Sequence, residues 1–260
     1  MLKVVILCGG LGTRLREETE FRPKPMVEVG SRPILWHIMK TYAHYGFRDF
    51  VLCLGYRGTM IKEYFLNYAA MNNDFTLALN CKSRIEYHGE HDEQDHAVTL
   101  VDTGLNAMTG ARVRRARRYV DGSTFMVTYG DGLANINLAA LLEFHRSHGK
   151  LATVSIVRPT SRFGLVDVDA SSRVTSFSEK PRVESWINAG YFVFEAGIFD
   201  YLTDDAACVL EREPMERVTA DSQLMAYRHD GFFYAMDTYR EYEALNKMWD
   251  AGQAPWKVWQ

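Results

Sequence analysis

Short apolar runs alternate with amphipathic segments along the first half of the chain. The runs at residues 4–8, 50–54 and 124–129 are rich in β-branched and aromatic side chains, and a glycine follows each of them. This pattern predicts three buried strands. Residues 34–42 and 138–148 instead carry apolar side chains at helical spacing. Strands that alternate with helices predict a mostly parallel sheet with helices on both faces.

The second half of the chain has a different pattern. Strand-like segments follow one another there without long helices between them, which predicts mixed or antiparallel members of the sheet. They span residues 152–157, 164–168, 173–178 and 187–194. We also expect helices at 60–68, 213–221 and 239–249, and a weak strand with a mobile loop in the polar stretch 72–96. Because no linker, repeat or low-complexity tract interrupts the sequence, we predict a single Rossmann-like α/β domain over residues 1–260.

Composition narrows the class of protein. The 260 residues are 47% hydrophobic and 24% charged, as in ordinary globular proteins, and the net charge of −3 argues against a nucleic-acid partner. No apolar run approaches the roughly 20 residues of a membrane span, and residues 1–3 lead straight into the first strand. We therefore expect a cytoplasmic protein that does not bind membranes. The apolar content and the tryptophans at 249, 256 and 259 suggest a homo-oligomer.

The cysteines and histidines carry no metal-binding pattern. Cys8, Cys53, Cys81 and Cys208 lack C-x-x-C spacing, and two of them lie in apolar strand-like runs. We therefore expect free thiols rather than disulfides or a zinc site. The histidines of the polar stretch, at 88, 91 and 96, lack the spacing of helical metal ligands and are interpreted as solvated.

The loop after the first strand carries the most specific chemistry. It holds three glycines, a hydroxyl and a guanidinium, at Gly9, Gly10, Gly12, Thr13 and Arg14. Glycines let backbone N–H groups approach a phosphate, and Thr and Arg add further donors. No Lys-Ser or Lys-Thr follows, as a Walker loop requires, and the third position of a dinucleotide fingerprint is leucine. The pattern predicts a different kind of nucleoside triphosphate site.

A carboxylate between two glycines follows the strand at 124–129. Ligands of open α/β sheets bind at the carboxyl ends of the strands, so Asp131 is expected to lie beside the glycine-rich loop. Mg²⁺ prefers one or two carboxylates together with phosphate oxygens and water, which Asp131 and a nucleotide supply. A second carboxylate, Asp237, is by spacing alone a helix N-cap. Of the basic residues between 112 and 118, most are expected on a solvated face and Arg112 is expected near a phosphate.

The motif G-G-x-G-T-R-L with the downstream Lys24-Pro25-Met26 resembles the signature of sugar nucleotidyltransferases. The resemblance extends over nearly the whole chain, including Y-G-D-G at 129–132, S-E-K-P at 178–181 and N-A-G-Y-F at 188–192. Within that family, I-L-W-H-I-M at 34–39, V-D-T-G at 101–104 and M-T-G at 108–110 are similar to the branch that uses CTP and glucose 1-phosphate. Ala189, in the strand expected to contact the sugar, leaves the identity of the hexose open.

The resemblance implies a role for each matching residue. The N-terminal half is expected to bind the nucleotide, through Leu7, Gly9, Gly10, Leu11, Gly12, Thr13, Arg14, Lys24, Thr109, Arg112 and Gly130. The C-terminal half is expected to bind the sugar phosphate, through Glu179, Lys180, Asn188 and Gly190. It also implies that Asp131 and Asp237 hold Mg²⁺, and that Arg14, Lys24, Asp131 and Lys180 are catalytic.

The expected reaction is a magnesium-dependent transfer of a cytidylyl group from CTP to glucose 1-phosphate, giving CDP-glucose and pyrophosphate for CDP-deoxysugars of surface polysaccharide. A sugar phosphate needs no strong general base, because its oxygen is already nucleophilic. The barrier comes from repulsion between two polyanions and from alignment, which a metal and cationic side chains reduce. The alternatives are another nucleotide such as UTP or dTTP, another hexose 1-phosphate, or a non-catalytic sugar-nucleotide-binding paralogue. The last is disfavoured because Lys24, Asp131, Lys180 and Asp237 are all present.

Overall fold

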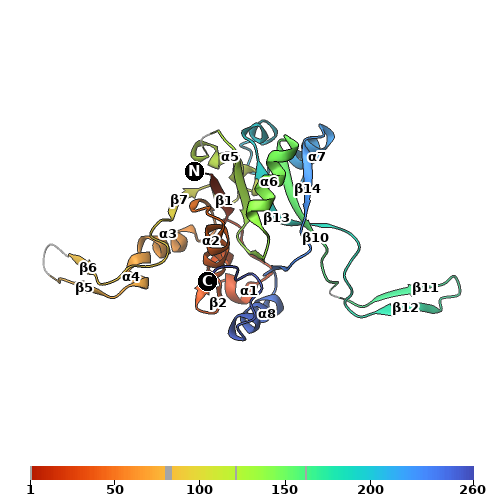
Figure 1. The fold of residues 1–260 in the computed structure, drawn as a ribbon, viewed down its shortest axis with the longest axis horizontal. Helices are drawn as coiled ribbons and strands as arrows, with labels where there is room; N and C mark the ends of the chain where they lie inside the picture. Colours follow the sequence, from red (N-terminus) through yellow and green to blue (C-terminus); the bar gives the residue numbers. More distant parts are fainter. Residues whose placement is uncertain (1, 80–83, 121, 162) are drawn as a thin grey trace.

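A seven-stranded sheet forms the centre of the molecule (Figure 1) in a computed structural model that describes residues 2–79, 84–120, 122–161 and 163–260. In spatial order its strands are β14 (Leu224–Arg228), β10 (Ala152–Val157), β13 (Ile187–Phe194), β8 (Phe125–Tyr129), β1 (Lys3–Leu7), β4 (Asp49–Leu54) and β7 (Ala97–Asp102). Only β13 is antiparallel to its neighbours, whereas all other pairs in the sheet are parallel. The predicted mostly parallel α/β fold is confirmed.

The helices cover both faces of this sheet. The longer ones are α2 (Ile34–His44), α3 (Gly58–Leu66), α5 (Thr109–Ala116), α6 (Leu138–His148), α7 (Glu213–Ala220) and α8 (Tyr239–Asp250). Short helical turns are α1 (Arg16–Thr19), α4 (Tyr68–Asn72), η1 (Lys24–Met26), η2 (Arg117–Tyr119) and η3 (Ala196–Tyr201). The predicted helices at 34–42, 138–148, 213–221 and 239–249 agree with these bounds, and the one predicted at 60–68 begins and ends two residues earlier, at 58–66.

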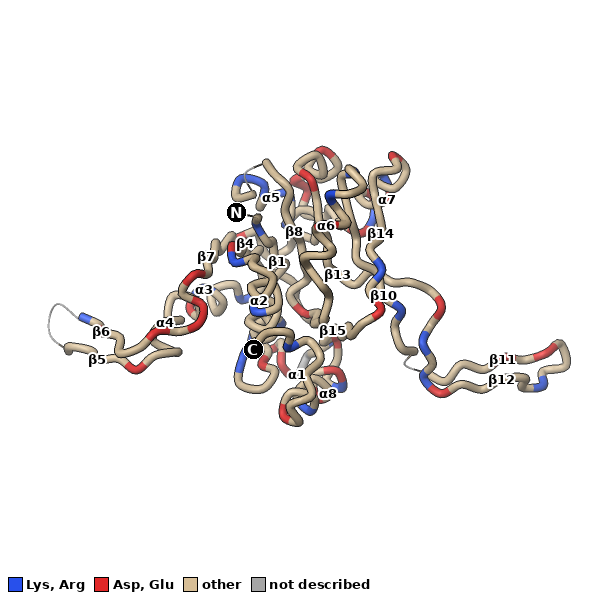
Figure 2. The backbone as a smooth tube through the Cα atoms, viewed as in Figure 1, with Lys and Arg blue, Asp and Glu red and all other residues tan. Residues whose placement is uncertain are grey.

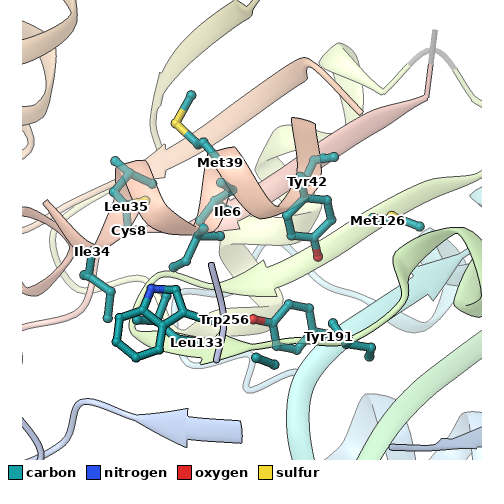
Figure 3. Close-up of a cluster of buried hydrophobic side chains, with 14 of the residues drawn as sticks. Ile6, Cys8, Ile34, Leu35, Met39, Tyr42, Met126, Leu133, Tyr191 and Trp256 are labelled. Carbon is teal, nitrogen blue, oxygen red and sulfur yellow. The ribbon is translucent and has the colours of Figure 1, made fainter. Parts of the chain in front are cut away.

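Successive residues of β1 contribute to two separate cores, because side chains alternate between the faces of a strand. Val4 and Ile6 pack with α2, α6 and the C-terminal segment, whereas Val5 packs with α5 and η3. Figure 3 shows the first core, in which Ile6 lies among side chains of α2 and Trp256. The sheet therefore presents only its strand ends to ligands.

Two ribbons project from this body (Figure 1). One pairs β5 (Phe75–Leu77) with β6 (Ile85–Tyr87), in the stretch expected to hold a weak strand and a loop. The other pairs β11 (Leu165–Val168) with β12 (Val174–Ser178). The expectation that the second half adds mixed members to the sheet is thus right for β10 and β13 and wrong for β11 and β12. Those two strands pair only with each other, outside the central sheet, and all their side chains are exposed.

Smaller features complete the fold. Two further two-stranded pairs join β2 (Glu28–Val29) to β3 (Arg32–Pro33) and β9 (Gly132–Ala134) to β15 (Phe233–Ala235). Acidic and basic residues are interspersed along the backbone (Figure 2). Across the described ranges, no helix combines the length and the apolar character that crossing a membrane requires. Cys8 and Cys53 are buried free thiols as predicted and Cys208 is a partly exposed one, while Cys81 lies outside the described residues.

A buried histidine makes the stability of the fold sensitive to pH. His37 of α2 is fully buried, its Nε2 bonds the carbonyl of Val29 at 2.9 Å, and the indole N–H of Trp256 donates to its Nδ1 at 3.3 Å. Burial lowers the pKa of His37 from 6.5 to about 4. The imidazole is therefore neutral in the folded protein at pH values where the unfolded chain already binds a proton.

We expect this histidine to cost stability in mild acid. The part of the unfolding free energy that depends on neutral His37 is complete above pH 6.5 and is lost as the pH falls from 6.5 towards 4. By linkage it amounts to about 2 kcal/mol at pH 5. Urea unfolding at pH 7 and at pH 5 measures it in the wild type, in His37→Gln and in His44→Gln, which changes an exposed histidine of the same helix. An equal acid loss of stability in all three proteins contradicts the assignment to His37.

Candidate active site

A pocket of about 430 Å³ opens at the carboxyl ends of β1 and β8. Ten of the eleven residues predicted to bind the nucleotide line it, namely Leu7, Gly9, Gly10, Gly12, Thr13, Arg14, Lys24, Thr109, Arg112 and Gly130. The eleventh, Leu11, is 52% exposed and lies outside this lining. Asp131 lines the pocket as well, so the fold brings the glycine-rich loop and the predicted metal ligand together.

The glycine-rich loop has little room for side chains. A Cβ at Gly9 would lie 2.0 Å from Nη1 of Arg112, and Gly12 adopts a positive φ of 65° that favours glycine. The Thr19 hydroxyl donates to the carbonyl of Gly12 at 2.9 Å and thereby ties the loop to α1. These contacts hold the backbone of the loop close to the pocket, as a phosphate-binding loop requires.

Arg112 is almost fully buried, and its guanidinium contacts protein oxygens at the ends of three strands. It donates to the carbonyls of Leu54, Gly104 and Gly9 at 2.8–2.9 Å and to the Thr103 hydroxyl at 2.8 Å. Burial lowers the pKa of Arg112 below its ordinary value. The predicted phosphate contact of Arg112 thus stays a prediction, and the side chain connects the glycine-rich loop to β4 and to the segment after β7.

Lys24 connects the two predicted metal ligands. Its Nζ lies 2.6 Å from Oδ2 of Asp131 and 2.8 Å from Oδ1 of Asp237, and Nη1 of Arg14 lies 2.8 Å from Oδ2 of Asp237. Burial opposes the charged form, but the two carboxylates together raise the pKa of Lys24 above its ordinary value. Three residues far apart in the sequence therefore form one charged cluster, which Arg14 extends towards solvent.

Asp237 is not the N-cap of the helix that follows it. That position belongs to Thr238, whose backbone N–H donates to Glu241 at 2.6 Å in a capping box. The Asp237 carboxylate faces Lys24 instead. Two carboxylates that share one ammonium converge on one point, and this donor set fits Mg²⁺ when phosphate oxygens and water complete the coordination. In the described part of the chain no group of three or more His, Cys, Asp or Glu side chains could hold a metal.

The residues predicted to bind the sugar phosphate fall into two groups. Asn188 and Gly190 lie on β13 beside Tyr129, whose hydroxyl accepts from Nδ2 of Asn188 at 3.0 Å. Glu179 and Lys180 lie beyond β12 at the base of the ribbon and contact each other at 3.4 Å. Lys180 lines a second pocket, of about 600 Å³, which Asp237 also borders. Asp237 therefore borders the same pocket as Lys180 and contacts Lys24, which lines the nucleotide pocket.

Backbone geometry marks two of these positions. Lys180 has a positive φ of 47°, a region that non-glycine residues rarely adopt. Gly190 has a φ of 77°, and a Cβ there would lie 2.3 Å from Cδ2 of Tyr129. The ring of Tyr129 thus packs directly on the backbone of Gly190.

Sequence reasoning missed two residues of the site. Tyr129 was recognised only as part of the Y-G-D-G motif, and Glu211 was not noticed, although both line the nucleotide pocket. Glu211 accepts hydrogen bonds from the hydroxyls of Thr109 and Tyr129, which are 102 and 82 positions away. Its surrounding residues form no motif, so only the fold identifies it.

Known proteins resemble this chain in sequence and in fold. Residues 3–249 match the nucleotidyl transferase family. The chain is 46% identical, over the full length of both proteins, to the glucose-1-phosphate cytidylyltransferase of Salmonella typhi. Among solved structures, HddC from Yersinia pseudotuberculosis complexed with GMP-PN has a TM-score of 0.67 and 22% identity, covering 96% of this chain and 100% of that one. UDP-glucose pyrophosphorylase complexed with UDP-glucose has a TM-score of 0.68 and 15% identity, covering 97% and 99%.

The two solved structures show only that the fold is shared, because their sequences are 22% and 15% identical to this chain. The family match and the 46% identity over the full length show the family. The chain is therefore an enzyme of the nucleotidyl transferase family.

Proposed function

We propose that this enzyme transfers a cytidylyl group from CTP to glucose 1-phosphate in a magnesium-dependent reaction that gives CDP-glucose and pyrophosphate. The observation that carries the proposal is the cluster of Lys24, Asp131 and Asp237 at the mouth of a glycine-lined pocket. The choice of CTP and glucose 1-phosphate is supported by the name of the Salmonella typhi relative. We also propose that the CDP-glucose formed is used to make CDP-deoxysugars for surface polysaccharide.

The proposed mechanism relies on positioning and on electrostatic stabilisation. The glycine-rich loop and Thr109 hold the nucleotide, and Arg14 and Lys24 turn from the carboxylates towards its phosphates. Asp131 and Asp237 would hold a Mg²⁺ ion, which would neutralise part of the phosphate charge. Lys180, which lines a pocket that Asp237 also borders, then holds the sugar phosphate in line with the α-phosphorus. In this division the N-terminal half binds the nucleotide and the C-terminal half binds the sugar phosphate.

Pyrophosphate release tests the function directly. Glucose 1-phosphate and Mg²⁺ are combined with CTP, UTP, dTTP, ATP or GTP, and the assay is then repeated with other hexose 1-phosphates. Turnover confined to CTP supports the proposal. Turnover with UTP or dTTP alone, or only with another hexose, keeps the mechanism and changes the substrate. Binding of sugar nucleotides without turnover points instead to a non-catalytic paralogue.

We further propose that the chain forms a homo-oligomer in the cytoplasm through its two ribbons. Cross-strand partners share a face of a ribbon, so Val166, Val168, Val174 and Phe177 form one apolar face of β11–β12. Phe75, Leu77, Ile85 and Tyr87 do the same on β5–β6. Isolated two-stranded hairpins are marginally stable in water, and apolar faces of this kind mark contact surfaces. An aromatic-lined pocket of about 560 Å³ between α2, α3 and β7 gives a second copy a complementary surface.

A charge on the apolar face of the β11–β12 ribbon is expected to dissociate the oligomer. Phe177 is 66% exposed in the single chain, so Phe177→Lys costs little inside one subunit but buries a charge between subunits. Light scattering should report a smaller mass for Phe177→Lys than for the wild type. Ser176→Lys, on the opposite face of the same strand, should keep the wild-type mass. A monomeric wild type, or equal masses for all three proteins, contradicts the proposal.

A further inference from the structure

Glu211 is an acidic residue that lines the nucleotide pocket, and the proposed mechanism assigns no role to it. Its Oε2 accepts from the Thr109 hydroxyl at 2.6 Å, and its Oε1 accepts from the Tyr129 hydroxyl. No described Lys, Arg or His forms a salt bridge with it. A carboxylate without a cation repels phosphates, so this part of the pocket suits groups that donate hydrogen bonds, such as sugar hydroxyls.

The hydrogen bonds of Glu211 continue into the strand expected to contact the sugar. The Tyr129 hydroxyl accepts from Nδ2 of Asn188 at 3.0 Å, and Oδ1 of Asn188 accepts from the backbone N–H of Gly190 at 2.7 Å. Burial, and then the charge of Glu211, raise the pKa of Tyr129, so its hydroxyl keeps the proton that it donates. One chain of hydrogen bonds therefore runs from the helix of Thr109 to β13.

The groups at the two ends of this series of hydrogen bonds can each act in only one way. An ionised carboxylate can only accept, and a backbone N–H can only donate. Between them the Tyr129 hydroxyl must donate to Glu211 and accept from Asn188, and the Asn188 amide must turn its oxygen to Gly190. Asn188 is itself exposed, so its second N–H and its second lone pair are free to meet a ligand in a defined order.

We propose that Glu211 is a positioning residue for the sugar: its carboxylate sets the direction of the Tyr129 hydroxyl and thereby the orientation of the Asn188 amide that recognises hexose hydroxyls. This inference rests on the function proposed above. A carboxylate is required because two hydroxyls donate to it, one to each oxygen. Glutamine offers one oxygen and one NH₂ group, so its single oxygen cannot accept from both hydroxyls as the two carboxylate oxygens do. Glu211→Gln therefore removes the charge and one of the two accepted hydrogen bonds while it keeps the shape of the side chain.

Steady-state kinetics of four variants test the proposal. They are Glu211→Gln, Tyr129→Phe, the double variant, and the control Glu213→Gln, which changes an exposed carboxylate two residues away. We expect Glu211→Gln and Tyr129→Phe each to raise the KM for glucose 1-phosphate by about tenfold, the worth of one hydrogen bond to the substrate. The double variant should be no worse than either single one, and discrimination between glucose and mannose 1-phosphates should fall. Glu213→Gln should behave as the wild type.

A second readout does not depend on turnover. In ¹⁵N-labelled protein the side-chain amide signals of Asn188, assigned by their loss in Asn188→Asp, should move in Glu211→Gln and Tyr129→Phe but not in Glu213→Gln. Unmoved signals overturn the proposal. So does an increase confined to the KM for CTP, which means that Glu211 acts through Thr109 alone. If the wild type turns over no substrate pair, the proposed function fails, and the amide signals still decide whether Glu211 orients Asn188.

Discussion

Lys24→Met should abolish most of the activity and at the same time strengthen the binding of divalent cations to the free enzyme. Turnover is expected to fall by about 10² to 10³, because the variant loses a cation that stabilises the phosphates in the transition state. The opposite effect on metal binding follows from the geometry. The Lys24 ammonium lies 2.6 and 2.8 Å from the two carboxylates and competes with the metal for both of them. Without it, Asp131 and Asp237 repel each other until a cation binds.

Pyrophosphate release measures the first effect, and electron paramagnetic resonance of Mn²⁺ without nucleotide measures the second. Lys40→Met is a matched control, because the side chain of Lys40 is only 13% exposed, against 10% for Lys24, and also lies between two carboxylates, at 3.2 Å from Glu93 and 3.7 Å from Asp92. It lines the aromatic pocket rather than the nucleotide pocket and should change neither quantity. Weaker Mn²⁺ binding in Lys24→Met contradicts the view that the lysine and the metal share one position.

The residues of this site that could be predicted from the sequence are those that lie next to a recognisable strand or motif. The glycine-rich loop and Asp131 each follow a buried strand, and parallel strands end at the same edge of the sheet, so their meeting could be predicted. Glu211 and Tyr129 are different. Their contact joins positions 82 residues apart that share no spacing rule, and a tyrosine at the end of an apolar strand resembles an ordinary core residue. Such contacts depend on the tertiary fold alone.

The fold shows the same division. Central strands such as β1 and β4 are buried on both faces, and their continuous apolar runs predict them. The edge strands β7 and β14 are half-exposed and mix polar with apolar residues, so no distinct pattern predicts them. The strands of the β11–β12 ribbon have the composition of sheet members, but they find no place in the sheet of one subunit. Composition indicates that a strand forms, whereas the partner of that strand depends on the whole chain. The exposed apolar faces of these two strands are the ones proposed to meet a second copy.

Arg112→Lys should destabilise the protein as well as weaken nucleotide binding. The side chain was expected at a phosphate, yet it donates to the carbonyls of Leu54, Gly104 and Gly9 from a position that is 4% exposed. Lysine keeps the charge but loses the planar array of five donors, so buried carbonyls remain unpaired. At 1–3 kcal/mol for each unpaired group, we expect a loss of about 3 kcal/mol of unfolding free energy. The melting temperature should fall by roughly 10 °C.

Arg115→Lys is the control, because Arg115 lies on the same helix and donates to the carbonyls of Thr103 and Asp204 from a half-exposed position, where water replaces a lost bond. Thermal unfolding and CTP binding at two salt concentrations separate the roles of Arg112. If it only contacts phosphate, Arg112→Lys keeps the wild-type melting temperature, and CTP affinity alone falls, with a weaker dependence on salt. If it holds the loop, stability and CTP affinity fall together, because the Gly9 carbonyl that it anchors belongs to the backbone that must approach the nucleotide.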